Sequence, residues 1–268
     1  FSDEILKVYQ EEIVLENKLN DAILNNELSV YFQPQYDADT GALRGAEALI
    51  RWLDENENVV YRPLDFIPLA EKNGTIIEIG NFVFREVFKS IHEWKVKYRA
   101  NYIISINVSA LQLQRSDFID NLQKLIDYYE VDPGLIELEI TESVLINDFD
   151  TMIETLRILS QLGIRVSLDD FGTGFSSLSY LRELPITTLK IDKSFIDDIC
   201  INNKTANITG SVVDMVKKLD LETVAEGVEH KEQLDCLKDM GCDLIQGFLL
   251  SKPVKKSEFE KIIIRQMP

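Results

Sequence analysis

Short apolar runs alternate along the chain with longer segments in which apolar residues recur about every 3.6 positions, the helical period. Eight of the runs predict β-strands: Leu28–Gln33, Leu43–Trp52, Tyr102–Val108, Leu135–Ile140, Arg165–Leu168, Thr188–Ile191, Glu222–Ala225 and Leu244–Gly247. Helical patterns cover Ile76–Lys97, Phe118–Tyr129, Val144–Leu162, Ser176–Leu184, Lys204–Leu219, Lys231–Met240 and Ser257–Arg265. Strands that alternate with helices in a chain of 268 residues predict an α/β fold, a (β/α)8 barrel.

The beginning of the chain departs from this alternation. No helical pattern separates the first two strands, and Asp37–Gly41 is typical of a turn. We therefore expect a barrel that is irregular at its first strands, with one antiparallel strand. Residues 1–24 predict one amphipathic helix, either a connector from an upstream regulatory domain or a cap on the fold. Residues 25–268 contain no Gly/Ser-rich linker and are expected to form one domain; the missing initiator Met suggests a fragment of a longer protein.

Composition narrows the classes of function. Lys and Arg number 28 and Asp and Glu 46, a net charge of −18, which argues against binding of duplex nucleic acid. No apolar run approaches the roughly 18 residues of a membrane span, and no secretory leader is evident. We therefore expect a cytoplasmic segment that does not itself contact a membrane, although the parent protein could be tethered to one. The three cysteines form no CxxC pair, which argues against a disulfide framework or a thiolate zinc site.

Polar side chains stand on or just after the predicted strands: Glu47, Asn107, Glu139, Glu142, Asp169, Asp170, Lys190, Glu226 and Gln246. The carboxyl ends of barrel strands meet at one mouth, so these side chains are expected to be neighbours. So many carboxylates at close range repel one another unless cations join them, and oxygen ligands without His or Cys favour Mg²⁺ or Mn²⁺. Two such ions suit in-line displacement at phosphorus, and Arg51 and Lys190 make the mouth locally favourable for a phosphate ester.

Simpler interpretations exist for each residue alone. A single Glu at a strand end is usually a solvated rim residue, and Asp170–Gly174 is compatible with a plain turn. Competing motifs are incomplete: Asp170-Phe171-Gly172 lacks the other kinase signatures, and no Walker loop, dinucleotide fingerprint or HExxH is present. It is the convergence of the whole set that favours a metal site.

The ordered motifs closely resemble the EAL-domain family, bacterial phosphodiesterases that hydrolyse cyclic di-GMP. The motifs that carry the resemblance are Tyr31-Phe32-Gln33-Pro34, Glu47-Ala48-Leu49-Ile50-Arg51-Trp52, Asn107-Val108-Ser109, Glu139-Ile140-Thr141-Glu142-Ser143, Asp169-Asp170-Phe171-Gly172-Thr173-Gly174, Lys190-Ile191-Asp192, Ala225-Glu226-Gly227-Val228-Glu229, Gln246-Gly247-Phe248 and Ser251-Lys252-Pro253. They span the chain from about residue 24 to its end.

The resemblance implies a modified TIM barrel and a role for each residue. Two Mg²⁺ or Mn²⁺ ions would be held by Glu47, Asn107, Glu139, Asp169, Asp170 and Glu226. Lys190 would orient the attacking water, with Glu226 as an alternative base. The dinucleotide would contact Gln33, Leu49 and Arg51. The shell of water around the metals would include Glu229 and Gln246. Glu142 would tether the Asp170–Gly174 loop, which in this family couples the metals to a homodimer interface.

The expected reaction gives linear pGpG, and Ca²⁺ is expected to support binding but inhibit hydrolysis. The alternatives are a catalytically silent cyclic di-GMP receptor and a scaffold that only transmits signals. Phe175 and Phe248 stand where the family commonly has Tyr-containing variants, so a hydroxyl is lost at each position while every expected metal ligand is retained.

Overall fold

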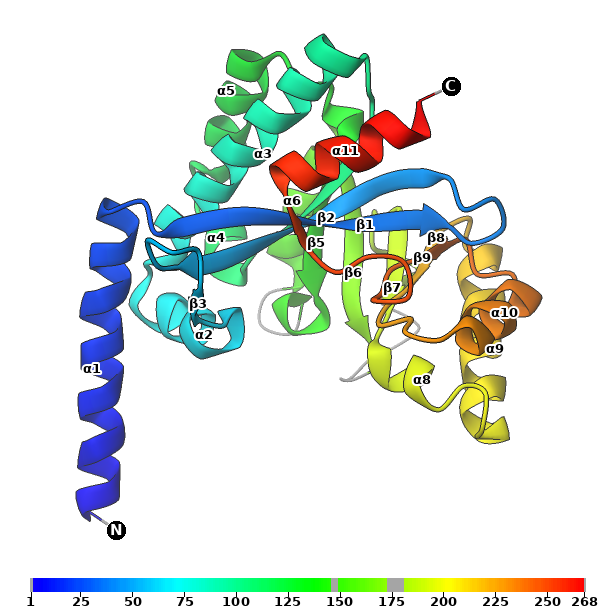
Figure 1. The fold of residues 1–268 in the computed structure, drawn as a ribbon, viewed down its shortest axis with the longest axis horizontal. Coiled ribbons are helices and arrows are strands. Elements are labelled where there is room, and N and C mark those ends of the chain that lie inside the picture. Colours follow the sequence, from blue (N-terminus) through cyan, green and yellow to red (C-terminus); the bar gives the residue numbers. More distant parts are fainter. Residues whose placement is uncertain (1, 146–148, 173–180, 268) are drawn as a thin grey trace.

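The computed structural model describes residues 2–145, 149–172 and 181–267, and its centre is a closed barrel (Figure 1). The barrel order is β1-β9-β8-β7-β6-β5-β4-β2, closed because β1 also pairs with β2. Its strands are β1 (Leu28–Asp37), β2 (Leu43–Leu53), β4 (Ile103–Asn107), β5 (Ile136–Thr141), β6 (Arg165–Phe171), β7 (Thr188–Ile191), β8 (Glu222–Ala225) and β9 (Leu244–Ile245). These correspond to the eight predicted strands and confirm the predicted fold class.

The irregularity predicted at the start of the barrel is present. β1 runs antiparallel to both of its barrel neighbours, β2 and β9, whereas the pairs from β2 through β4 to β9 are parallel. A turn joins β1 to β2, and in it the Asp37 carboxylate accepts hydrogen bonds of 2.7 Å from the Thr40 amide and hydroxyl. Two short strands were not predicted: β3 (Val59–Tyr61) pairs with β2, and β10 (Val254–Lys255) pairs with β1.

Helices surround the barrel (Figure 1). They are α1 (Ser2–Leu24), α2 (Pro63–Asn73), α3 (Ile76–Tyr98), α4 (Ala110–Leu113), α5 (Phe118–Tyr129), α6 (Phe149–Gln161), α8 (Lys193–Asp197), α9 (Asn203–Lys218), α10 (Lys231–Met240) and α11 (Lys256–Gln266). The prediction of one helix over Val144–Leu162 was wrong at its start, because residues 142–145 form a 3₁₀ turn and α6 begins at Phe149. Most of the predicted helix Ser176–Leu184 lies outside the described residues, and α2, α4 and α8 were not predicted.

Helix α1 has two different halves. Near its end Leu19 and Ala22 are completely buried, and Lys18 donates a hydrogen bond of 3.2 Å to the Tyr61 hydroxyl. Its first turns extend away from the rest of the molecule (Figure 1). The last turns therefore pack on the domain, while the division of the chain at residues 24 and 25 remains a prediction.

Along the barrel strands, the polar side chains face the barrel interior and the apolar side chains face outward, toward the helices. In β5 the apolar residues Ile136, Leu138 and Ile140 belong to the hydrophobic core shared with the helices. Glu137 and Glu139, between them, are buried as well, and both contact side chains of β7, which is not adjacent to β5 in the sheet. Their side chains therefore point into the barrel. The interior of this barrel is polar, and the apolar core lies between strands and helices.

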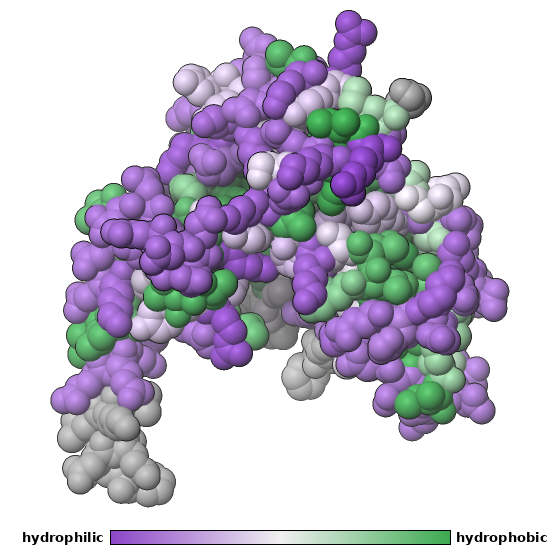
Figure 2. All heavy atoms as spheres, in the orientation of Figure 1, coloured by the Kyte–Doolittle hydropathy of each residue, from purple (hydrophilic) through white to green (hydrophobic). Residues whose placement is uncertain are grey.

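The surface agrees with the acidic composition. Hydrophilic residues cover most of the face in Figure 2, interrupted by separate apolar patches. In the described parts of the chain, no helix combines the length and the apolar character that crossing a bilayer requires.

Candidate active site

A buried lysine lies at the centre of the predicted site. The Nζ atom of Lys190, on β7, lies 2.7 Å from Glu139 Oε2 on β5 and 2.7 Å from Glu226 Oε1, just after β8. Asp169 Oδ1 is 3.3 Å and Glu47 Oε2 is 3.7 Å from the same nitrogen. Lys190 is only 1% exposed, so four carboxylates from four strand ends enclose its ammonium group.

Two amides donate hydrogen bonds to the Glu47 carboxylate, one to each oxygen. Asn107 Nδ2 donates a hydrogen bond of 2.7 Å to Glu47 Oε1, and Gln246 Nε2 donates one of 2.6 Å to Glu47 Oε2. The same Gln246 nitrogen lies 3.2 Å from Gln33 Oε1. Residues far apart in the sequence are thus neighbours because barrel strands deliver their ends to one mouth.

Asp169 and Asp170 end β6 and diverge because of their backbone. Asp170 has a φ of 56°, in the left-handed region, and its amide donates a hydrogen bond of 2.9 Å to Asp169 Oδ1. One carboxylate oxygen each of Asp169, Asp170 and Glu226 lies within 4.8 Å of the others. This spacing allows the three groups to share a cation.

The segment that follows is tied to the end of β5. The amide of Gly172 donates a hydrogen bond of 3.0 Å to Glu142 Oε1. Gly172 has a φ of 99°, and a Cβ there would lie 2.6 Å from the Phe195 ring, so only glycine fits. Thr173 and Gly174 of the predicted loop, and Phe175, lie outside the described residues.

Among the described residues, no hydrogen bond or ion pair joins Glu229, Arg51 or Leu49 to the carboxylates around Lys190. Glu229 is exposed and accepts a hydrogen bond of 2.7 Å from Lys193. Arg51 donates to the backbone oxygen of Ile50 at 2.7 Å, and Leu49 is half-buried on β2. Leu49 and Arg51 follow Glu47 on the same strand, so they extend the site toward its rim.

We use the name mouth cluster for Glu47, Asn107, Glu139, Asp169, Asp170, Lys190 and Glu226. Burial raises the pKa of Glu226 to about 8 and, together with Glu47 and Asp169, raises that of Glu139 well above its usual value. Burial alone would lower the pKa of Lys190, but Glu139 and the other carboxylates raise it well above normal. One lysine cannot compensate five carboxylates.

The donor set fits hard divalent cations. Glu139 Oε1 is buried and has no hydrogen-bond partner among the described residues, although Oε2 of the same carboxylate is bound to Lys190. A buried carboxylate oxygen without a partner, beside several other carboxylates, fits a group that would accept a cation. Since the donors are oxygens, Mg²⁺ or Mn²⁺ suits them.

A second charged cluster, not predicted, fills the opposite end of the barrel interior. Arg44 Nη2 lies 2.9 Å from Glu137 Oε1 and 3.2 Å from Glu222 Oε2. Arg165 pairs with the same two carboxylates, at 3.2 Å for Nε to Glu137 Oε1. Thr188 donates to Glu137 at 2.7 Å. We call Arg44, Glu137, Arg165 and Glu222 the base cluster; in it burial would raise the pKa of Glu137, but Arg44 lowers it to about 2.

A β-bulge brings Arg44 into this cluster. Gln35 of β1 is opposite Gly45, and Tyr36 is opposite Leu43, so Arg44 is an extra residue in β2. Strict alternation along β2 gives no hint of this. The sequence did contain one indication of a charged barrel interior, the run Ile-Glu-Leu-Glu-Ile in β5. In it two acidic residues alternate with apolar ones, in a strand that is paired on both edges.

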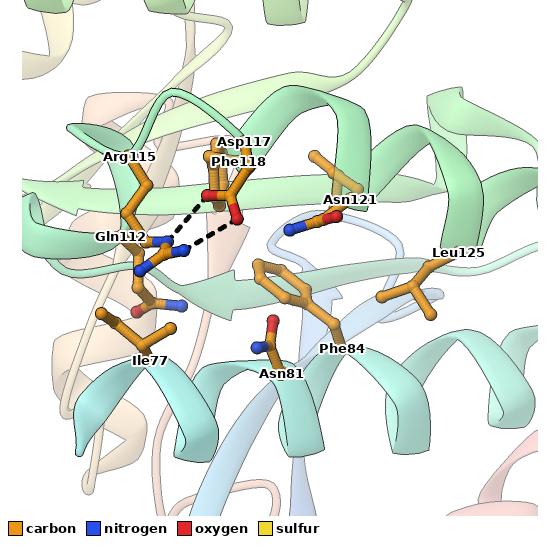
Figure 3. A pocket seen from close by; sticks show the side chains of 10 residues that line it. Ile77, Asn81, Phe84, Gln112, Arg115, Asp117, Phe118, Asn121 and Leu125 are labelled. Carbon is orange, nitrogen blue, oxygen red and sulfur yellow. Dashed lines mark hydrogen bonds and ion pairs between the residues drawn. The ribbon is translucent and has the colours of Figure 1, made fainter. Parts of the chain in front are cut away.

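A small cavity outside the barrel is separate from both clusters. It has a volume of about 80 Å³ and lies between α3 and α5, with the Phe84 ring between Asn81 and Asn121 (Figure 3). At its edge Arg115 and Asp117 pair with each other at 2.7 Å. The polar groups here are not assembled around a reactive centre.

Comparison with known proteins places this geometry in context. The family model of the EAL domain matches residues 16–253. The signaling protein YkoW of Bacillus subtilis is 41% identical over 98% of this chain, and the cyclic di-GMP phosphodiesterase NbdA of Pseudomonas aeruginosa is 34% identical over 98%. The chain spans about a third of these relatives, 32% and 34% of their lengths. The solved structure described as PaMucR phosphodiesterase in complex with c-di-GMP superposes with a TM-score of 0.87 at 36% identity, covering 91% of this chain and 99% of the other.

Proposed function

The chain belongs to the EAL domain family, and from this premise we propose that it hydrolyses cyclic di-GMP to linear pGpG with two bound divalent cations. The observation that carries the proposal is the enclosure of Lys190 by carboxylates from separate strand ends. That arrangement is a poor choice for stability alone, because uncompensated buried charge is costly. It is what a cation-dependent phosphodiesterase requires.

Six residues would hold the cations: Glu47, Asn107, Glu139, Asp169, Asp170 and Glu226. Asp169, with an oxygen within 4.8 Å of oxygens of both Asp170 and Glu226, would be a central member of this ligand set. When bound, Mg²⁺ or Mn²⁺ supplies an acidified water and neutralises charge on the phosphate oxygens. Ca²⁺, with longer and more variable coordination, should allow substrate binding and inhibit turnover.

The protein's own groups would prepare the water and the phosphodiester. Lys190 can donate hydrogen bonds from a fixed position, because its surrounding carboxylates hold it, and so would orient the attacking water. Water would add to phosphorus and give up one proton to a base of the site, the bond from phosphorus to one ribose 3′-oxygen would break, and the departing oxygen would take up one proton to become a hydroxyl. Glu226, 2.7 Å from Lys190, is the alternative base for the water proton.

Substrate contacts would come from the rim of the same mouth. Arg51 would bind a phosphate oxygen, and Leu49 and Gln33 would contact the rest of the dinucleotide. Glu229 and Gln246 would lie in the shell of water around the cations. In the structure Gln246 contacts Glu47, whereas Glu229 is bonded to Lys193, so this role for Glu229 requires a change of partner.

Regulation would involve further parts of a longer protein. The relatives named above are about three times as long as the matched segment, which supports further domains in a longer protein. We propose that one of them is an upstream regulatory domain joined through α1. The hydrogen bond from Gly172 to Glu142 supports a tether at the Asp170–Gly174 loop, and we propose that this loop couples the cation site to a homodimer interface. We place this segment in the cytoplasm, where cyclic nucleotides are made.

Turnover by the purified chain is the direct test. Cyclic di-GMP is incubated with the protein and Mn²⁺, Mg²⁺ or Ca²⁺, and the products are separated by chromatography, with Asp169→Asn as the matched inactive variant. We expect linear pGpG with Mn²⁺ and Mg²⁺ and almost none with Ca²⁺. Tight binding of cyclic di-GMP without any product in all three metals would instead identify a silent receptor.

A further inference from the structure

A glutamine on β1 connects the two charged clusters inside the barrel. Gln35 is completely buried, and its Oε1 accepts a hydrogen bond of 3.1 Å from Arg44 Nη1 in the base cluster. Its Nε2 donates one of 2.9 Å to Gln246 Oε1, and Gln246 Nε2 donates one of 2.6 Å to Glu47. We propose that Gln35 is a positioning residue, which sets the orientation of the Gln246 amide and through it the metal-binding geometry of Glu47.

The direction of this relay follows from the chemistry of its first member. A guanidinium has donors and no acceptor, so Arg44 requires the oxygen of Gln35 to face it. The nitrogen of Gln35 then faces Gln246, which must answer with its own oxygen. The amide of Gln246 is thereby left with its nitrogen toward Glu47, the one orientation in which it stabilises a carboxylate.

A reversed amide at Gln246 would harm the site. Its oxygen would then face the Glu47 carboxylate, and two acceptors in contact repel each other. An amide by itself has two orientations of similar shape. Glu47 Oε2 and Gln33 Oε1 both accept from the Gln246 nitrogen, and the donor from Gln35 adds the constraint on the Gln246 oxygen. Arg44 can hold Gln35 in turn because three charged contacts, two to Glu137 and one to Glu222, fix its position.

The inference rests on the proposed function insofar as Glu47 is a metal ligand, and its test uses metal binding as well as turnover. Gln35→Glu is nearly isosteric and keeps an acceptor for Arg44, but its second oxygen cannot donate to Gln246. The amide of Gln246 should then rotate and withdraw its donor from Glu47. Since outer-shell partners of metal ligands typically contribute about 10–100-fold in affinity, we expect Mn²⁺ to bind about tenfold more weakly, as measured by electron paramagnetic resonance of the free ion.

Two further variants separate positioning from a structural effect. Ser105→Ala removes a different hydrogen bond to the base cluster, the 2.8 Å bond from Ser105 Oγ to Glu137, and should leave Mn²⁺ affinity unchanged. Gln246→Met removes the middle of the relay and should itself weaken Mn²⁺ binding. In that background Gln35→Glu should have no additional effect, because its influence passes through Gln246.

The outcomes distinguish the relay from the proposed function. Weaker Mn²⁺ binding in Gln35→Glu, a matching fall in kcat/KM and no further loss in the double variant support the relay. The relay alone is overturned if the wild-type protein hydrolyses cyclic di-GMP but Gln35→Glu leaves the Mn²⁺ affinity unchanged. It is also overturned if Gln35→Glu weakens Mn²⁺ binding equally in the wild-type protein and in Gln246→Met. A wild-type protein that neither binds Mn²⁺ nor hydrolyses cyclic di-GMP overturns both.

Discussion

The mouth cluster and the base cluster occupy the same barrel interior and are built from the same kinds of residue, yet their charges are balanced in opposite ways. Two arginines and two glutamates make the base cluster neutral. At the mouth five carboxylates share one lysine, and four of them lie within 3.7 Å of its nitrogen. Glu137 and Glu139, two positions apart on β5 and both 1% exposed, have opposite pKa shifts. Neighbouring charges, and not burial, therefore separate the paired carboxylate of Glu137 from the proposed metal ligand Glu139.

The largest effect should come from removing a mouth carboxylate. Glu47→Gln deletes one proposed oxygen ligand and one of the excess negative charges, so we expect kcat/KM with Mn²⁺ to fall by more than about 100-fold, beyond the range of outer-shell changes. The melting temperature without metal should not fall. Cyclic di-GMP hydrolysis and thermal unfolding are measured side by side; activity close to wild type would remove Glu47 from the ligand set.

The corresponding change in the base cluster should reduce stability. Glu137→Gln leaves Arg44 and Arg165 with one carboxylate between them, and breaking a buried ion pair from one side typically costs about 3–5 kcal/mol. We expect that loss in the free energy of unfolding by urea, against about 1 kcal/mol for Ser105→Ala, which removes a single hydrogen bond. If the two variants were equally stable, the ion pairs of Glu137 with Arg44 and Arg165 would contribute no more to stability than one hydrogen bond.

Acid should weaken the base cluster in a defined range. The pKa of Glu137 is lowered from 4.5 to about 2 in the folded protein, so the unfolded chain takes up this proton first as the pH falls. The resulting stabilisation, on the order of 3 kcal/mol, is complete above pH 4.5 and is lost as the pH falls toward 2. Urea unfolding at pH 7 and pH 3 should therefore show a smaller gap between wild type and Glu137→Gln at the lower pH; a constant gap would argue against this titration.

The smallest effect is expected at the edge of the mouth. Glu142→Ala removes the hydrogen bond from the Gly172 amide, worth about 1 kcal/mol, so kcat should fall about fivefold while the cations remain bound. Steady-state kinetics and sedimentation would be measured on the same samples, with Glu142→Gln as the variant that keeps an acceptor. If both variants lose activity equally, the charge of Glu142 matters more than its bond to the loop.

The contrast between the clusters also explains what the sequence could reveal. The mouth residues were predicted because they follow recognisable apolar runs, and a barrel needs only the identity of its strands to bring their ends together. The base cluster was missed because Arg44 enters through a bulge, and because Arg165 and Glu222 begin their strands, where charged residues are ordinarily solvated. The alternation of polar and apolar residues along a single strand does not show that these charged groups meet inside the barrel.

The missed helix α2 shows a similar limit. Pro68 lies inside it, and proline removes a backbone donor and usually ends a helix. The helix nevertheless persists because Phe66, Leu69 and Ala70 are buried against the domain. The strands β3 and β10 were missed for a simpler reason: with three and two residues they carry no measurable period.

The outward direction of the apolar side chains has a consequence for how such proteins evolve. Because Ile136, Leu138 and Ile140 carry the packing on the outer side of β5, the acids at the mouth are not needed to keep the chain folded. A duplicated copy released from selection can therefore lose its chemistry through one substitution without any penalty in solubility or half-life. Descendants that lack the proposed reaction should accumulate readily on this scaffold and retain the shape of the barrel.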